Sequence, residues 1–159
     1  MKITIIAVGK IKEKFYREAI AEYSKRLSKY CRFEILEVED EKTPEQASDT
    51  MKHQILTKEA DRINALIKSS SYVIATAIEG KKQDSVSFSG NIESICLKGN
   101  SHITFLIGGS LGLSKELKKK ADELLSFSDM TFPHQLMRLI LTEQIYRAFR
   151  IMNHEPYHK

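Results

Sequence analysis

Short apolar runs alternate with longer segments of helical spacing along the chain. The short runs are rich in β-branched and aromatic residues, which is typical of strands. They predict strands over these ranges: Lys2–Val8, Arg32–Val38, Tyr72–Ile78 and Ile103–Ile107. A further short strand or loop is expected from Ser126, running directly into the last helix. Tyr72–Ile78 is nearly all apolar, which indicates a strand covered on both faces.

Between the strands, apolar residues recur at the three- and four-residue spacing of a helix. Five helices are predicted: Ile11–Leu27, Pro44–Ser69, Ser87–Leu97, Ser114–Leu125 and Pro133–Met152. Ser87 is the expected cap of the third helix, and Glu79–Lys81 is the expected turn before it. Pro133 suits a first helical position, where a missing N–H is tolerated.

Strands and helices alternate five times, so the fold class is α/β, with a mostly parallel sheet and helices on both faces. A chain of 159 residues fits one domain with a substantial core, and no repeat or linker divides residues 1–159.

The last predicted helix is apolar around most of its circumference. A helix of this kind is buried on more than one side, whereas the last helix of a small sheet covers only one face. We therefore predict a homodimer through this helix. The alternative is an unusually deep position within a monomer.

Composition narrows the class of protein. The net charge of +4 and the pI near 9.0 favour an anionic partner such as RNA. No apolar run is long enough to span a membrane and no signal peptide is evident, so we expect a cytoplasmic protein. Cys31 and Cys96 lie far apart and are expected to be buried free thiols, and no histidine or cysteine spacing predicts a metal site.

A ligand site is predicted where two strand ends lead into helices. Ile103–Ile107 is followed by the glycine-rich run Gly108–Gly112, and Ser126–Arg138 leads into the last helix. Ligands of parallel sheets bind at the carboxyl ends of strands. The run is neither a P-loop nor a G-x-G-x-x-G motif, and it is either a tight turn or a close approach to a ligand. The single Gly9 after the first strand argues against an ordinary Rossmann dinucleotide or methyltransferase site, whose glycine loop follows the first strand.

Polar residues at the start of the last helix suggest chemistry. His134 and Arg138 lie one turn apart and fit a polarising pair, although a locally bonded histidine is the simpler alternative. Glu143 and Arg147 form an expected i,i+4 pair on a second stripe. The lysines of the fourth helix are more typical of a solvated face than of an RNA clamp.

Several runs together resemble one family: Ile6–Lys10, Leu106–Gly109, Thr131–Arg138, Glu143–Ala148 and Pro156–Lys159. The chain is similar over its whole length to the RlmH family of the SPOUT superfamily, which methylates N3 of a pseudouridine in large-subunit ribosomal RNA. The resemblance implies a C-terminal trefoil knot, an exception to the rule against knots, and a homodimer. It also implies S-adenosyl-L-methionine as cofactor and a 23S rRNA stem-loop of the assembled ribosome as substrate.

The resemblance also implies which residues contact the cofactor. The matching positions are Thr76, Gly108, Phe127, Ser128, Asp129, Met130, Thr131 and Phe132. Thr76 stands where an aliphatic residue is expected, and Asp129 adds a carboxylate to the loop. A backbone contact is compatible with Thr76. These departures therefore bear on the affinity for the cofactor rather than on the assignment to the family.

Four residues are candidates for catalysis. Arg138 offers fixed donors to a ring that gains negative charge, and His134 or His158 is suited to accept the N3 proton. Tyr157 and His158 are expected to fold over the substrate, and the partner chain is one possible source of them; the alternative is a frayed terminus. The rival function classes are a non-enzymatic ribosome- or RNA-binding protein and an α/β nucleotide-binding regulator.

Overall fold

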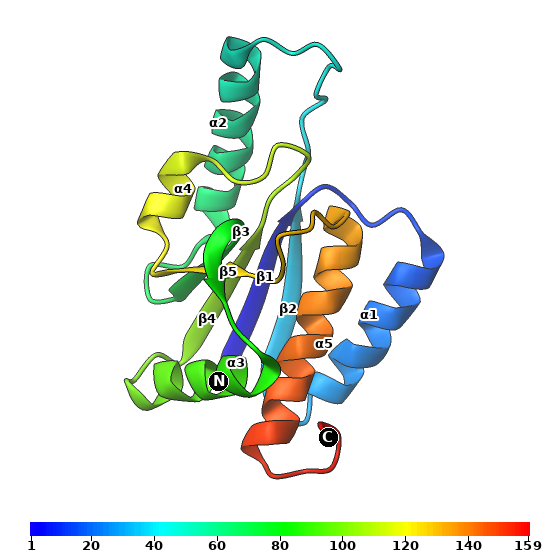
Figure 1. The fold of residues 1–159 in the computed structure, drawn as a ribbon, viewed down its shortest axis with the longest axis vertical. Helices are drawn as coiled ribbons and strands as arrows, with labels where there is room; N and C mark the ends of the chain where they lie inside the picture. The colour runs from blue at the N-terminus through cyan, green and yellow to red at the C-terminus, as the bar shows by residue number, and fades with distance from the viewer.

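Five parallel strands form the central sheet in the order β2-β1-β4-β3-β5 (Figure 1). Their bounds are β1 Lys2–Val8, β2 Arg32–Val38, β3 Tyr72–Lys82, β4 His102–Ile107 and β5 Glu123–Ser126. The computed structural model describes all of residues 1–159. The predicted parallel sheet is confirmed, and β1 and β2 have the predicted bounds.

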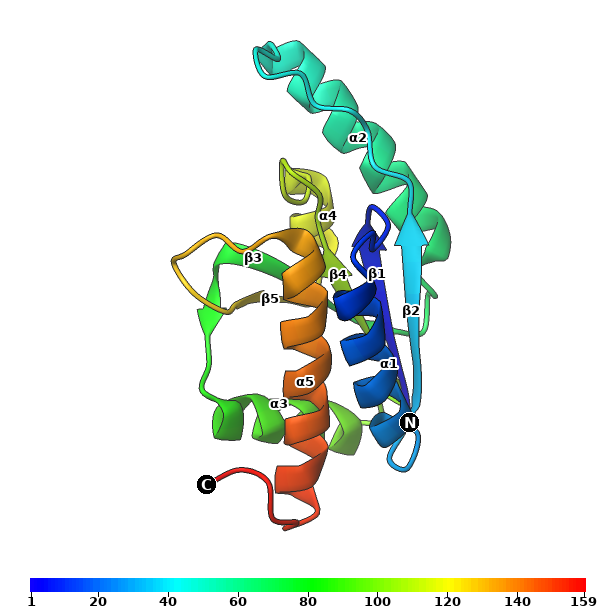
Figure 2. The ribbon, with the colours of Figure 1, turned by 90° about the vertical axis from the view of Figure 1, so that its right-hand side faces the viewer.

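Helices cover both faces of this sheet, as predicted. Their bounds are α1 Lys14–Leu27, α2 Asp49–Leu66, α3 Ser85–Leu97, α4 Lys115–Lys120 and α5 His134–Met152. α1, α3 and α5 lie together on one face, and α2 and α4 lie on the other (Figure 2). No helix combines the length and the apolar composition needed to cross a membrane.

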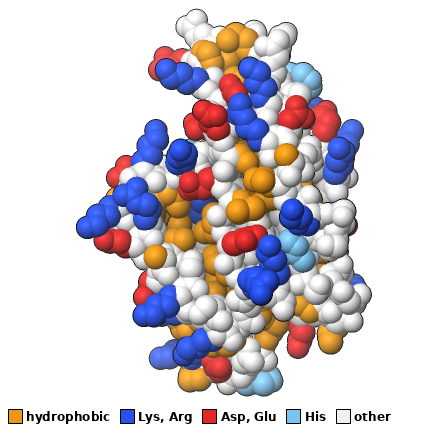
Figure 3. Space-filling view, turned by 180° about the vertical axis from the view of Figure 1, so that it is seen from behind, with side chains coloured by type: hydrophobic (Ala, Val, Ile, Leu, Met, Phe, Trp, Pro, Cys, Tyr) orange, Lys and Arg blue, Asp and Glu red, His pale blue; other side chains and the backbone are white.

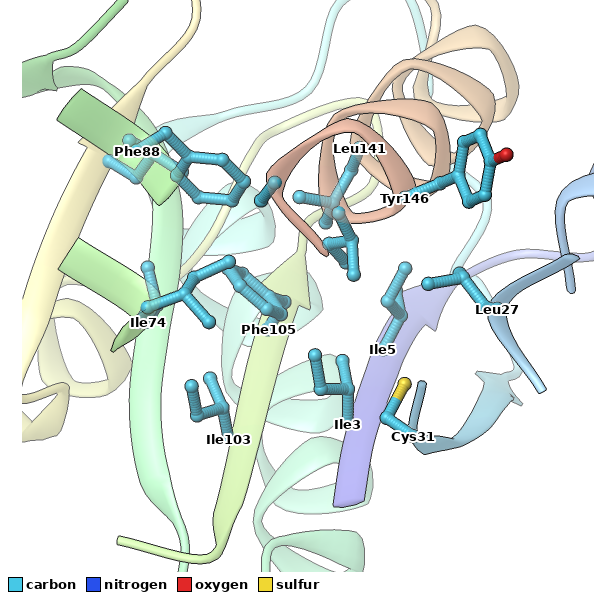
Figure 4. Close-up of a cluster of buried hydrophobic side chains, with 14 of the residues drawn as sticks. Ile3, Ile5, Leu27, Cys31, Ile74, Phe88, Ile103, Phe105, Leu141 and Tyr146 are labelled. Carbon is cyan, nitrogen blue, oxygen red and sulfur yellow. The ribbon is translucent and has the colours of Figure 1, made fainter. Parts of the chain in front are cut away.

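The side chains of β1 contribute to two separate hydrophobic cores, because successive strand residues point to opposite faces of the sheet. Ile3 and Ile5 pack with α1, α3 and α5 in the larger cluster, where Phe105 of β4 and Leu141 of α5 meet them (Figure 4). Ile6 packs with α2 and α4 in the smaller cluster. An almost continuous apolar strand is what a sheet covered on both faces requires.

The predicted fourth helix is too long at its C-terminal end. α4 ends at Lys120, and Glu123–Ser126 is a strand rather than helix. Asp122 binds both backbone groups of Val73: its N–H donates to Val73 O at 2.9 Å, and its carboxylate accepts from Val73 N at 2.7 Å. These two bonds fix the chain at the edge of β3. There the backbone hydrogen bonds between β3 and β5 outweigh the weak local preference of residues 123–125 for a helix.

The predicted turn at Glu79–Lys81 is also wrong, because β3 continues to Lys82. Leu125 of β5 pairs with both Thr76 and Lys81, so residues 77–80 bulge around it. A Cβ on Gly80 would lie 2.7 Å from backbone atoms of Leu124 and Leu125. The glycine therefore marks a close crossing of two chain segments. The predicted threading of a knot through this region stays a prediction.

Three helix starts differ from the predicted ones. Ser48 caps α2 by accepting from Met51 N, so the helix begins five residues after Pro44. Asp84, and not Ser87, caps α3 and accepts the Ser87 N–H at 2.7 Å. α1 begins at Lys14 rather than Ile11. At the fifth helix the difference is one residue, because Pro133 is the N-cap and His134 begins the helix.

α5 packs between α1 and α3 on one face of the sheet (Figure 2). Its inward residues, such as Leu141, Ile145 and Ala148, are fully buried. Its outward apolar residues, such as Leu136 and Leu139, stay half-buried. The predicted homodimer through this helix stays a prediction.

Candidate active site at the carboxyl ends of the strands

Three chain segments enclose a cavity of about 720 Å³ at the carboxyl ends of β3, β4 and β5. Its walls consist of residues 76–79, 107–113, 125–128 and 130–134, together with Lys118 and Met137. This volume falls within the range of sites for small organic ligands. The cavity lies where the sequence predicts a ligand site.

Seven of the eight predicted cofactor contacts line this cavity. They are Thr76, Gly108, Phe127, Ser128, Met130, Thr131 and Phe132. Asp129 is outside the wall, and its exposed carboxylate forms an ion pair with Lys82. The Thr76 hydroxyl donates to Leu106 O at 2.8 Å, so this side chain is occupied within the sheet. Thr76 can therefore meet a ligand through its backbone, as expected.

The glycine-rich run is both a tight turn and a wall of the cavity. A Cβ on Gly108 would lie 2.3 Å from the carbonyl carbon of Gly112, so no other residue fits. Gly112 has a φ of +74°, and its N–H donates to Gly109 O at 3.0 Å. The run is thus a tight turn that also lines the cavity, and its close approach to a ligand stays a prediction.

Charged groups stand at the wall formed by β3 and α4. Glu79 and Lys118 both line the cavity and form an ion pair there. The Lys118 ammonium holds the pKa of Glu79 below its usual value. Sequence reasoning missed this pair because it placed Glu79 in a turn and Lys118 on a solvated face. The opposite rim carries Met130, whose side chain is exposed.

His134 is the catalytic candidate that lines the cavity. Burial and then the nearby Arg138 charge lower its pKa, while Asp40 opposes them. A lowered pKa keeps the imidazole neutral, and a neutral imidazole can accept a proton. The imidazole Nε2 lies close to the turn after β1, at 3.5 Å from where a Cβ on Gly9 would stand.

Arg138 does not line the cavity. Its side chain is fully buried, and Nη2 donates to Val8 O at 2.8 Å and to Gly9 O at 2.7 Å. Nη1 forms an ion pair with Glu37 Oε1 at 2.7 Å. These bonds fix the carboxyl end of β1 beside His134. The sequence could have suggested Glu37, because it is an acidic residue at the carboxyl end of a parallel strand, the edge where ligand sites lie.

Tyr157 and His158 fold back against the second half of α5, whereas the cavity lies at the N-terminal end of this helix. The 19 residues of α5 span about 28 Å at the helical rise. The Tyr157 hydroxyl donates to Glu143 Oε1 at 3.0 Å, and its ring lies 4.6 Å from the Arg147 guanidinium. The predicted Glu143–Arg147 pair is present at 2.6 Å. The tail is therefore bound to its own helix and does not reach its own cavity.

No group of three or more histidine, cysteine or acidic side chains is arranged to hold a metal ion. Both cysteines are free thiols: Cys31 is buried, as expected, and Cys96 is only half-buried. Burial raises the pKa of the Cys31 thiol to about 11. The charged groups of the site are therefore those around His134 and the Glu79–Lys118 pair.

Comparison with known proteins identifies the family. The model described as "Predicted SPOUT methyltransferase" matches residues 1–158. The chain is 60% identical to the ribosomal RNA large subunit methyltransferase H of Bifidobacterium adolescentis, over 159 residues and the full length of both. It is 58% identical, again over both full lengths, to the protein of the same name from Streptococcus uberis.

A solved structure supports the fold alone. The probable methylase family protein from Haemophilus influenzae Rd KW20 aligns with a TM-score of 0.53 at 11% identity. The alignment covers 99% of this chain and 70% of that one. The match of the family model and the full-length identities in sequence show that the chain belongs to the SPOUT methyltransferase family.

Proposed function

We propose that the protein transfers a methyl group from S-adenosyl-L-methionine to N3 of a pseudouridine in a 23S rRNA stem-loop of the assembled ribosome. The carrying observation is the cavity of about 720 Å³, built from three strand-end segments and dependent on Gly108. Full-length identity with proteins named ribosomal RNA large subunit methyltransferase H supports the substrate class.

The cavity fits this cofactor in size and in chemistry. Apolar side chains such as Ile107, Leu113 and Phe127 suit the flat face of an adenine ring. Gly108 has no side chain to cover its peptide group, and the segment 127–132 lies outside the helices and strands, so both can offer backbone groups to a ligand. The bound cofactor would supply a methyl group already activated on a sulfonium, so the protein mainly aligns donor and acceptor.

His134 is the proposed proton acceptor. The N3–H of the pseudouridine must lose its proton before the nitrogen lone pair can form a bond to the methyl carbon. His134 is the histidine on the cavity wall, and its lowered pKa keeps the imidazole neutral near neutral pH, with one ring nitrogen free to accept a proton. Loss of the methyl group, with the bonding electron pair kept by sulfur, would convert the sulfonium of the bound cofactor into a neutral thioether.

Arg138 has a proposed role in positioning. The sequence suggests that it stabilises charge on the substrate ring, but three of its hydrogen bonds go to protein acceptors. Direct contact with substrate would break this clamp. The geometry favours a role in which Arg138 fixes Gly9 and the start of α5, and thereby His134.

A partner chain would complete the site. Tyr157 contacts Glu143 and His158 lies near Arg147, and these two positions are about 14 and 20 Å along α5 from His134 at a rise of ~1.5 Å per residue. Antiparallel pairing of two α5 helices would bring the tail of each chain to the cavity of the other. The half-buried outward residues of α5, such as Leu136 and Leu139, are suited to such a contact.

Calorimetry and methyl transfer test the proposal. The protein should bind S-adenosyl-L-methionine about once per chain, and it should label ribosomes from a strain that lacks this gene. The labelled nucleotide, recovered by nuclease digestion and mass spectrometry, should be N3-methylpseudouridine. A protein that binds ribosomes but not the cofactor would instead be the rival RNA-binding module.

A further inference from the structure

An exposed aromatic residue stands among basic residues at the start of α1. Phe15 is 60% exposed, and its ring centroid lies 4.4 Å from that of Tyr16. The segment 10–17 carries four basic residues and one acidic residue: Lys10, Lys12, Lys14, Arg17 and Glu13. Figure 3 shows Lys and Arg side chains gathered on the projecting part of the surface where α1 begins, at the left of the view.

This segment is rigidly attached to the rest of the fold. Arg17 donates to Ile11 O at 3.2 Å and to Lys12 O at 2.8 Å. The Ile11 N–H donates to Glu37 Oε1 at 3.1 Å, which ties the segment to the carboxylate that also binds Arg138. The surface is therefore preorganised, and little conformational entropy is lost when it binds a partner.

The same segment borders the candidate active site. The Lys12 N–H donates to Gln135 Oε1 at 3.0 Å, and Gln135 follows the cavity residue His134 in sequence. A nucleotide next to the target base would therefore lie within reach of α1. All the basic side chains of the segment are exposed. Lys14 also forms a loose ion pair with Glu18, at 3.4 Å.

We propose that this surface, residues 10–17, binds unpaired RNA nucleotides that flank the target base. The proposal rests on the proposed function and specifies its substrate contact. The Phe15 ring provides a face on which a base can stack, and Lys10, Lys12 and Lys14 reach the adjoining phosphates. Aromatic platforms with basic rims are typical of sites for single-stranded nucleic acid.

Charge favours RNA over a second copy of this chain. A two-fold contact places the same patch against itself, so the basic residues of both copies would face one another. A phosphate backbone instead neutralises each of them and releases counterions. The Phe15 and Tyr16 rings by themselves also offer little apolar area for a protein interface.

Cosedimentation with ribosomes and steady-state methylation test this surface. Phe15→Ala should weaken ribosome binding and raise KM for ribosomes about ten-fold, the scale of a lost base stack, with kcat and cofactor affinity unchanged. Phe15→Tyr should restore both values. Lys12→Gln with Lys14→Gln should lower the salt slope of binding by about two. Leu97→Ala, at an apolar residue 83% exposed on α3, is the matched control and should change nothing.

Two results would overturn the proposal. One is unchanged ribosome binding in both the Phe15 and the lysine variants. The other is a fall in the mass of Phe15→Ala by light scattering, which would make Phe15 a contact between subunits. Cosedimentation does not depend on methyl transfer, so failure of the enzymatic proposal would appear separately as wild-type protein that binds ribosomes without labelling them.

Discussion

Replacing Arg138 with methionine separates a positioning role from direct contact with the substrate. Methionine keeps much of the side-chain volume but removes every donor. Val8 O and Gly9 O, both in buried residues, then lose the bonds of 2.8 and 2.7 Å that Nη2 makes. The β1 end and the turn beside His134 lose their anchor.

The magnitude follows from those two acceptors. Each buried carbonyl left without its donor costs about 1–3 kcal/mol. The Glu37 pair adds little, because that carboxylate is partly exposed and can turn toward water. A loss of about 3 kcal/mol would lower the melting temperature by roughly 6–12 °C in a domain of this size.

Urea unfolding followed by circular dichroism measures this loss, and methyl transfer is assayed below the transition. Arg26→Met is the control, because Arg26 forms an exposed i,i+4 pair with Glu22 and should leave the midpoint unchanged. Turnover of Arg138→Met should fall together with its stability. A variant that unfolds at the wild-type urea concentration and has lost all turnover would refute the positioning role and place the guanidinium on the substrate.

Three further predictions concern the cavity, the tail and the proton acceptor. Gly108→Ala should abolish cofactor binding measured by calorimetry, since its Cβ would meet Gly112 at 2.3 Å. The control is Gly90→Ala, which has open space around it in α3 and should raise the free energy of unfolding by about 0.4–1 kcal/mol. Deleting residues 155–159 should abolish methylation and spare cofactor binding; unchanged turnover would remove the tail from the mechanism. The acid limb of the pH–rate profile should lie below the ordinary histidine pKa of about 6.5, because activity needs neutral His134. Asp40→Asn removes an anion that raises this pKa, so the limb should move to still lower pH; a shift to higher pH would exclude His134 as the acceptor.

The sequence by itself determined the order of elements and the place of the site. Five alternations of strand and helix followed from periodicity, because the apolar face of each element is a local property. The glycine-rich run after Ile107 and the segment entering α5 marked the cavity, since parallel strands end at one edge of the sheet.

Only the tertiary structure decided where long-range contacts override local pattern. Leu124 and Leu125 fit a helix locally, yet the edge of β3 and the clamp of Asp122 on Val73 make them a strand. The burial of Arg138 and the distance of Tyr157 from its own cavity likewise depend on contacts between residues more than 100 positions apart, or on the way the tail folds back against α5. Such contacts produce no periodic pattern of apolar and polar residues in the sequence, because they are fixed by the packing of whole elements.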